Sequence, residues 1–222
     1  MQRIGIISGV DTELAAFLPD LPRTGVPGLP LAVSHVAWEG KDLFLLCNGI
    51  GKVSAAVAAT VLRACCGVDL LFVIGTAGKI GTADGALFNI VEAVQADFGA
   101  QRAEGLVHYT PGEWPIGPAS VSAFRAAPLP ASGLPEIRIA TSDLFIECGV
   151  HAARVRDRLG AMLVDMETAA VAQVAHAMGV PWAAIKATTD NADGESAGDF
   201  RANLKRAARA SAEAAEKAIA AL

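Results

Sequence analysis

The sequence predicts an α/β fold, organised as a single three-layer domain over residues 1–222. Short apolar runs alternate with segments of helical period along the chain, which favours a sheet covered by helices. One run, Asp69–Ile74, is apolar almost throughout, as is typical of a strand buried on both faces of a parallel sheet. The 222 residues contain no linker or internal repeat, and this length fits one α/β domain.

Composition argues against several classes of protein. The net charge of −5 does not indicate the basic surface that binding of nucleic acid requires. Hydrophobic residues make up 53% of the chain, yet no apolar run approaches the roughly 20 residues of a membrane helix. The chain enters the strand-like run RIGIISG at once, without signal-peptide architecture, so we expect a cytoplasmic location. The four Cys and four His are scattered without metal-ligand spacing; we expect buried free thiols and no metal site.

The first part of the chain predicts a strand, a helix, a hairpin and a second helix. Leu21–Leu31 is rich in Pro and Gly and must be a loop. Alternating or apolar runs at Leu31–Trp38 and Leu43–Asn48 flank the turn residues EGKD, which predicts a hairpin. The other elements expected here are a strand at Arg3–Ser8, a helix starting within Leu14–Leu18 and a long apolar helix at Val53–Cys66, opened by the glycine turn GIGK.

The middle of the chain predicts two strands and a long polar segment. After the buried run Asp69–Ile74, the small residues Gly75-Thr76-Ala77-Gly78 predict a turn at which backbone can approach a ligand. Ala86–Ala96 reads as a strand and Val121–Ala126 as a short helix. Between them, Asp97–Pro118 predicts a long loop, and such loops are often functional or form subunit contacts.

The last part predicts three strands and three helices. An Ala-rich segment of helical period follows Ala161–Val164; Asp165 suits its N-cap and Gly179 its C-terminal stop. The remaining expectations are a strand at Ile137–Ala140, a loop over a site at Thr141–Ile146, a helix at Val155–Leu159, a strand at Trp182–Ala187, a polar turn at Thr188–Gly194 and a final helix at Phe200–Leu222 that packs back on the sheet.

Three acids directly follow strand-like runs: Glu13, Glu167 and Asp190. Ligands of α/β sheets bind outside the carboxyl ends of the parallel strands, so we expect these carboxylates to line one site. Glu167 should lie in the first turn of a mostly buried helix, where it needs a partner such as a ligand hydroxyl. The alternative, that Glu167 only supports the helix through the dipole, stays open. The pattern alone fits many α/β enzymes.

The motifs taken together identify a family. GIISG followed by Glu13, then NGIGKVSAA, VIGTAG, VDMETAAVAQVA and KATTDNAD, resemble the nucleoside phosphorylase/nucleosidase superfamily. The likeness looks closest to its hydrolytic branch, the 5′-methylthioadenosine/S-adenosylhomocysteine nucleosidases, and runs from residue 1 to about residue 215. The ME pair before the late helix and the TTD turn are its specific part. The resemblance implies a nucleoside phosphorylase-like fold, a single-domain three-layer α/β/α sandwich with a twisted mixed central sheet.

The resemblance also implies a role for each matching residue. Glu13 matches the acid that deprotonates the attacking water, and Asp190 the acid that protonates nitrogen 7 of the leaving purine. The other positions match substrate contacts: Met166 packs on the ribose, Glu167 binds the ribose hydroxyls, Thr76 and Gly78 line the base and ribose, and Phe145 and Ile146 hold the base. The chemistry needs such a set, because the ribose becomes cationic and the base anionic as the N-glycosidic bond breaks. Acid–base groups and water suffice, so we expect no cofactor.

Phosphorolysis is the close competitor of hydrolysis. A phosphate nucleophile needs fixed cations, and the phosphorylase branch that this chain resembles places an Arg just before the glycine turn. Val73 stands at that position here, and no Arg follows Glu13 in the first helix. A buried phosphate without a cation would cost several kcal/mol. The sequence therefore favours water as the nucleophile.

Some residues depart from the family pattern. Lys186 stands where the nucleosidases usually carry Arg, Asp165 replaces the more usual Glu, and Lys79 follows the TAG turn where Gly is common. The segment 96–106 resembles the futalosine hydrolases, a sister branch that typically carries Asn at the position of Asp190. The leaving base (adenine or hypoxanthine) and the 5′ substituent therefore stay open.

The sequence disfavours two other classes of function. A catalytically silent nucleoside-binding member is disfavoured by the intact set of Glu13, Glu167 and Asp190. A dinucleotide-dependent oxidoreductase is disfavoured because the GVDTE turn lacks the glycine fingerprint. The expected partners are a purine nucleoside and water, with neither nucleic acid nor membrane. The resemblance implies a homodimer, in which the loop carrying Tyr109, Pro111 and Trp114 either caps a neighbouring subunit's site or is an ordinary surface loop.

Overall fold

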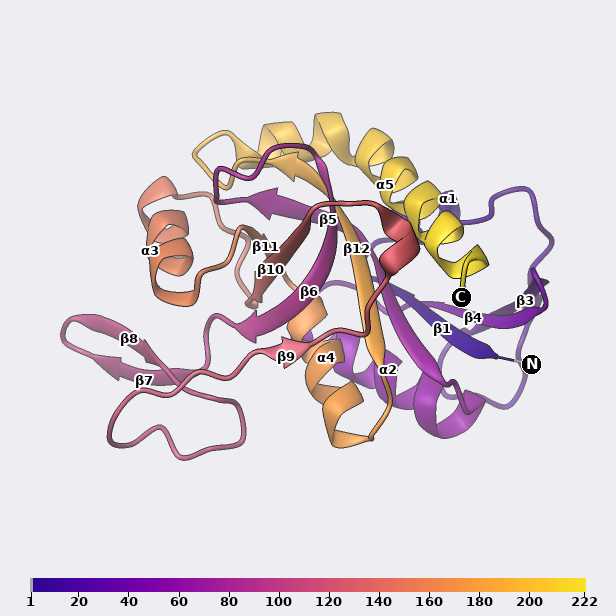
Figure 1. Cartoon of the computed structure of the whole chain (residues 1–222), viewed down its shortest axis with the longest axis horizontal. Coiled ribbons are helices and arrows are strands. Elements are labelled where there is room, and N and C mark those ends of the chain that lie inside the picture. The colour runs from indigo at the N-terminus through magenta and orange to yellow at the C-terminus, as the bar shows by residue number, and fades with distance from the viewer. Residues whose placement is uncertain (1) are drawn as a thin grey trace.

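The computed structural model describes residues 2–222 and shows a central β-sheet with helices on both faces (Figure 1). The strands are β1 (Arg3–Ser8), β2 (Thr24–Gly25), β3 (Ser34–Trp38), β4 (Lys41–Cys47), β5 (Leu70–Lys79), β6 (Leu87–Gln95), β7 (Gly99–Arg102), β8 (Gly105–His108), β9 (Phe124–Arg125), β10 (Glu136–Thr141), β11 (Leu163–Asp165) and β12 (Trp182–Asp190). The helices are α1 (Asp11–Ala16), α2 (Lys52–Cys66), α3 (Gly149–Leu159), α4 (Thr168–Ala177) and α5 (Ser196–Ala220), with a 3-10 turn at Pro130–Ser132.

The sheet is mixed, as the resemblance implied. Its described strands follow the order β11-β10-β6-β12-β5-β1-β4-β3-β2, and β9 adds to β6. β5 lies parallel to β1 and β12, whereas β12 is antiparallel to β6 and β3 antiparallel to β4. The register of the central pair sets Asp190 of β12 beside Gly78 of β5. Residues far apart in the sequence therefore meet at one edge of the sheet.

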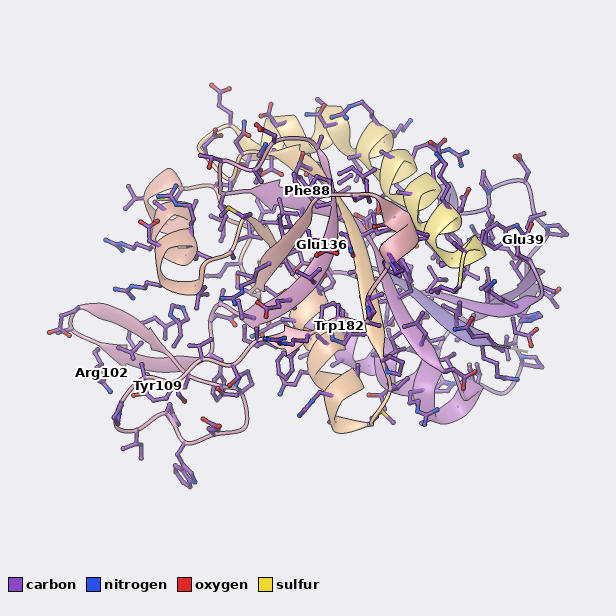
Figure 2. The ribbon with its side chains drawn as sticks, in the orientation of Figure 1. Glu39, Phe88, Arg102, Tyr109, Glu136 and Trp182 are labelled. Carbon is purple, nitrogen blue, oxygen red and sulfur yellow. The ribbon has the colours of Figure 1, made fainter. Side chains whose placement is uncertain are left out.

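Two apolar cores hold the layers together. On one face α2 and α4 pack on the sheet, in a core that includes Phe88 of β6 and Trp182 of β12. Both side chains are buried, and both are labelled on the sheet in Figure 2. On the other face α5 packs on β12 and β5 and contacts α1. Alanines on α5, such as Ala212 and Ala215, are fully buried and allow this helix to lie close to the strands. The expected three-layer sandwich is confirmed.

Several predicted elements are confirmed with shifted ends. β1 has the predicted bounds, the β3–β4 hairpin forms, and the C-terminal helix packs on the sheet. Gly179 adopts the left-handed conformation (φ +61°) expected of a helix stop. Asp165 accepts a hydrogen bond from the backbone N–H of Thr168 (3.0 Å), but the expected N-cap at Asp165 is wrong, because α4 begins only at Thr168 and its N-cap is Glu167. α1 begins at Asp11, earlier than predicted.

Three local predictions are wrong because tertiary pairing overrides local sequence. Gly75–Gly78 form no turn: β5 continues through Lys79, since β12 and β11 both pair with this stretch. Val121–Ala126 form no helix; β9 pairs with β6, and Phe124 packs on His176. The segment Asp97–Pro118 contains the β7–β8 hairpin, which projects from the sheet and carries Arg102 beside Tyr109 (Figure 2).

The cysteines are free thiols, but the expectation that all are buried is wrong. Only Cys66 is buried, while Cys65 and Cys148 are exposed and Cys47 is intermediate. Across residues 2–222, none of the helices combines the length and the apolar character needed to cross a lipid bilayer.

Candidate active site

A cavity of about 490 Å³ opens where β1, β5, β11 and β12 end. The N-terminal end of α5 and the loop before α3 complete its wall, at the edge of the sheet nearest α3 (Figure 1). This volume is typical of a site for a small organic ligand. All eight residues singled out in the sequence line it: Glu13, Thr76, Gly78, Phe145, Ile146, Met166, Glu167 and Asp190.

Glu13 lies in α1 with only 4% of its surface exposed. Its Oε1 accepts hydrogen bonds from the backbone N–H (2.8 Å) and the hydroxyl (2.7 Å) of Thr76. Burial raises the pKa of this carboxyl, against the opposing effects of the Lys186 charge and the Thr76 hydrogen bonds. A raised pKa brings a carboxylate closer to the proton affinity that a base needs near neutral pH.

The close approach of Glu13 depends on Gly75. A Cβ at that position would lie 2.6 Å from Glu13 Oε2, and the φ of +135° is one that L side chains rarely adopt. The Gly75 N–H donates to the hydroxyl of Ser211 on α5 (3.0 Å), which in turn donates to the Ile185 carbonyl (2.8 Å). The strand is thereby fixed where the carboxylate meets it.

Glu167 occupies the N-cap position of α4 and is 7% exposed. Its side chain does not cap the helix; Oε1 instead accepts from the backbone N–H of Gly51 (3.2 Å) at the start of α2. Within the described chain, no group donates to Oε2. Burial raises the pKa of Glu167 to about 7, with Lys186 opposing the shift and Asp165 adding to it. A carboxylate held in this way can still accept hydrogen bonds from ligand hydroxyls. This favours the interpretation that Glu167 binds a ligand over the interpretation that it only supports the helix through the dipole.

Asp190 ends β12 and is 6% exposed. Its Oδ2 accepts from the Thr189 hydroxyl (2.8 Å) and its Oδ1 from the backbone N–H of Ala192 (3.0 Å). Gly78 of β5 passes so close that a Cβ there would lie 3.0 Å from Oδ1. The three acids thus come from α1, the start of α4 and the end of β12, and they line a single cavity.

A buried lysine underlies the acids, and the sequence pointed to it only as a departure from the family pattern. Lys186 is 2% exposed, and its Nζ lies 3.1 Å from Asp165 Oδ2. Burial disfavours its charged form, but the carboxylates of Asp165, Glu167 and Glu13 together raise the pKa of Lys186. The signal was present in the sequence: a lysine inside the apolar strand WAAIKATTD has to be paired.

The rim of the cavity is largely apolar. The loop 142–146 was expected over a site, and it does contribute Leu144, Phe145 and Ile146 to the lining. The Phe145 ring meets the Phe200 ring of α5 edge to face, with centroids 5.9 Å apart. The motifs did not point to four further lining residues: Val10, Ile50, Phe200 and Arg201. Ile50 lies in the GIGK turn, whose glycines alone were a weak signal.

The site can bind a polar ligand and exchange protons with it. Two buried carboxyl groups, Glu13 and Asp190, can accept or donate protons, and a third, Glu167, can accept hydrogen bonds from hydroxyls. Exclusion of water strengthens each of these interactions. Such a set suits cleavage of a bond that separates a cationic fragment from an anionic one.

Comparison with known proteins finds relatives that match nearly the whole chain. The Phosphorylase superfamily model matches residues 3–220. The chain is 31% identical to the 5′-methylthioadenosine/S-adenosylhomocysteine nucleosidase of Chromohalobacter salexigens, over 99% of this chain and 97% of that protein. It is 30% identical to the nucleosidase of the same name from Actinobacillus succinogenes, over 95% of each chain.

Solved structures show the same fold. A Helicobacter pylori MTAN mutant with 5′-methylthioadenosine in its active site superposes with a TM-score of 0.87, at 22% identity over the whole of both chains. The native futalosine hydrolase of Helicobacter pylori gives 0.86, at 24% identity over 100% of this chain and 98% of that one. The match over residues 3–220, together with relatives at 30–31% identity over nearly the full length, shows that the chain belongs to the phosphorylase superfamily.

Proposed function

We propose that this protein hydrolyses the N-glycosidic bond of purine nucleosides of the 5′-methylthioadenosine and S-adenosylhomocysteine type. The products are the free purine base and the corresponding thioribose. One observation carries the proposal: three buried carboxylates from separate elements line a cavity of nucleoside size. The near full-length relatives with that name support the substrate class.

In the proposed mechanism Glu13 takes a proton from water as the water oxygen bonds to the anomeric carbon. The bond from that carbon to the purine nitrogen breaks, its electron pair stays on the base, and Asp190 protonates nitrogen 7. Glu167 holds the ribose hydroxyls through charge-assisted hydrogen bonds, and Met166 packs on the sugar. Thr76, Gly78, Phe145 and Ile146 line the base and ribose. Each acid–base step is typically worth about 10²–10⁴-fold in rate.

The charges around the cavity favour water over phosphate as nucleophile. Four carboxyl residues line the cavity, namely Glu13, Asp165, Glu167 and Asp190. Lys186, the buried cation beneath them, already pairs with Asp165. A phosphate beside Glu13 would therefore meet like charges, which raises its cost of burial. The expectation of hydrolysis drawn from Val73 gains support from this arrangement.

The first test is an assay of base release. The protein is incubated with methylthioadenosine, adenosylhomocysteine, adenosine, inosine and futalosine, with and without phosphate. Free thioribose without phosphate, formed fastest from the two thio-nucleosides, is the expected result. Turnover of futalosine alone would move the protein to the sister branch, and strict phosphate dependence with a sugar 1-phosphate product would overturn hydrolysis.

The second test addresses the acid that protonates the base. Asp190→Asn keeps the size of the side chain but removes its proton, so we expect adenine release to fall at least about 10²-fold. Asp193→Asn is the matched control, because Asp193 follows closely but does not line the cavity. Equal melting temperatures would show that both variants fold. Full activity of Asp190→Asn would remove Asp190 from the mechanism.

The homodimer and the cytoplasmic location stay predictions.

A further inference from the structure

The proposed function leaves the group on the 5′ carbon of the nucleoside open. Glu13, Glu167 and Asp190 are at most 7% exposed, so water, ribose and base belong in the deep part of the cavity. A substituent on the 5′ carbon then extends toward the remaining, more exposed lining. The side chains there decide which substituent is accepted.

This outer lining is apolar apart from one residue. Ile50 and Leu144 are 55% and 54% exposed and border the opening, together with Val10 and Phe200. Arg201 follows Phe200 on α5 and is the one cationic residue among the described residues that line the cavity. The spacing i, i+3 and i+4 places Ala197, Phe200 and Arg201 on the same face of α5, and all three line the cavity.

The guanidinium of Arg201 has no partner among the residues that the structure describes. None of the hydrogen bonds or ion pairs found within residues 2–222 involves it. By contrast, Arg209 on the same helix pairs with Glu213 (2.7 Å) and donates to the Ala16 carbonyl, and Arg206 donates to Asn203. Asp190, close to α5 in the sequence, accepts its hydrogen bonds from Thr189 and Ala192 instead. A free planar guanidinium at the edge of an apolar opening is suited to receive a carboxylate.

We propose that Arg201 is a specificity residue that selects nucleosides whose 5′-thio substituent ends in a carboxylate. The inference rests on the proposed function and goes further, because methylthioadenosine ends in a methyl group whereas adenosylhomocysteine ends in a carboxylate with an ammonium beside it. The apolar rim residues take the methylene groups of the substituent, and Arg201 binds its end through paired N–H donors. The carboxylates deeper in the cavity repel an anion, so the rim is the favourable place for one.

The test uses two matched compounds: 5′-deoxy-5′-(3-carboxypropylthio)adenosine and its methyl ester. They differ in charge at the end of the substituent, and the nucleoside is the same. For each, kcat/KM is measured by adenine release, and Kd by calorimetry in the Asp190→Asn background, in which hydrolysis is slow. The variants are Arg201→Gln and the control Arg206→Gln, which lies on the same helix outside the cavity lining. The acid-to-ester ratio within one variant cancels any loss of folded protein.

We expect the unmodified protein to prefer the acid by about two- to fivefold, the range of an exposed ion pair. Arg201→Gln should bring the ratio to about one, while Arg206→Gln keeps it. The preference should weaken at high salt, because the pair is screened. A ratio near one in the unmodified protein, or a ratio unchanged by Arg201→Gln, overturns the role of Arg201.

The outcomes separate the inference from the proposed function. Release of adenine from both compounds without preference contradicts only the role of Arg201. Binding with the expected preference but without adenine release contradicts hydrolysis and keeps Arg201 as a binding residue. Binding of neither compound contradicts both. Stimulation by inorganic phosphate that Arg201→Gln abolishes would assign the guanidinium to a phosphate nucleophile and overturn the inference.

Discussion

Each of the three acids at the site lies against a glycine. Gly75 faces Glu13, Gly9 faces Glu167 and Gly78 faces Asp190, and a Cβ at any of these positions would lie 3.0 Å or less from a carboxylate oxygen. The absent side chains let the carboxylates reach the strands and leave the cavity open. The glycines of the early motifs therefore shape the site through space as well as through backbone conformation.

Gly78→Ala tests this contact without straining the backbone, because Gly78 has an ordinary φ. The new Cβ would lie 3.0 Å from Asp190 Oδ1 and 3.2 Å from Val164, so the carboxylate has to move by a few tenths of an ångström. Because acid–base catalysis depends on position, we expect a loss in kcat of about 10- to 100-fold. Steady-state kinetics measures it. Gly194→Ala is the control, since nothing lies within 4 Å of its Cβ; equal kinetics of the two variants would contradict the argument.

The raised pKa of Glu167 predicts a pH-dependent cost to stability. Below about pH 4.5 the carboxyl is protonated in both the folded and the unfolded chain, so it makes no difference. Between about 4.5 and 7 only the unfolded chain loses the proton, which lowers the free energy of unfolding as pH rises. Above about 7 both are ionised, and the penalty stays constant at up to about 3 kcal/mol.

Glu167→Gln removes this penalty. The stability gained over the unmodified protein should therefore grow from about pH 4.5 to 7 and level off above that range. Urea unfolding at a series of pH values measures it. Glu136→Gln, at an exposed position that starts β10 (Figure 2), is the control and should show no comparable trend. A difference between Glu167→Gln and the unmodified protein that does not change with pH would contradict the prediction.

The sequence predicted those helices and strands whose formation depends on the local pattern of residues. The buried strands, the helix that follows β11 and the stop of that helix at Gly179 follow from apolar period and helix-stop chemistry. The predicted turn at Gly75–Gly78 failed because small residues also suit a strand whose two neighbours approach closely. Val121–Ala126 failed because pairing of β9 with β6 depends on residues some 30 positions away.

The candidate site was predictable for a different reason. All eight residues carried over from the motifs line the cavity, because strand ends and helix starts fix their positions. Arg201 and Phe200 could not be found this way, since their place in the lining depends on where α5 crosses the strands. The pairing of Lys186 with Asp165 likewise requires the fold, which places β12 parallel and β11 antiparallel to the same strand, β5.

The loop over the cavity is tethered to the start of α2. Asp143 accepts a hydrogen bond from the Lys52 backbone N–H (2.7 Å), and its own N–H donates to Asp97 (2.9 Å), which also pairs with the Lys52 ammonium. Asp143→Ala frees the loop residues Leu144, Phe145 and Ile146. We expect KM to rise about three- to tenfold with little change in kcat, because part of the binding energy is then used to order the loop.

Initial-rate kinetics across substrate concentrations separates the two parameters. Asp157→Ala is the control: this exposed acid on α3 pairs with Arg156 next to it and lies outside the cavity lining. An unchanged KM for Asp143→Ala would show that the loop holds its position without the tether. A large loss in kcat would instead mean that the loop aligns the reacting groups.

Large apolar side chains are exposed on the protein surface at the start of α2, in the loop 142–146 and in the segment that follows the β7–β8 hairpin. Val53 is 75% exposed, Trp114 83% and Ile116 72%. Trp114 and Ile116 lie two positions apart in one segment, and neighbouring exposed apolar side chains are typical of an interaction site. The hairpin and the loop that follows it extend away from the sheet (Figure 1), as a segment that contacts a second copy would. The predicted homodimer therefore gains a candidate contact in Trp114.

Trp114→Ser tests that contact, because a buried aromatic at an interface typically contributes 2 kcal/mol or more to association. We expect the unmodified protein to elute at twice the chain mass in size exclusion with light scattering, and the variant to dissociate at about tenfold or higher protein concentration. If the loop also caps the neighbouring site, kcat/KM falls with dimer content. Leu222→Ser removes an exposed apolar side chain at the chain end and should change neither property. A monomer in the unmodified protein with full nucleosidase activity would show that Trp114 is an ordinary surface residue and that each chain carries a complete site.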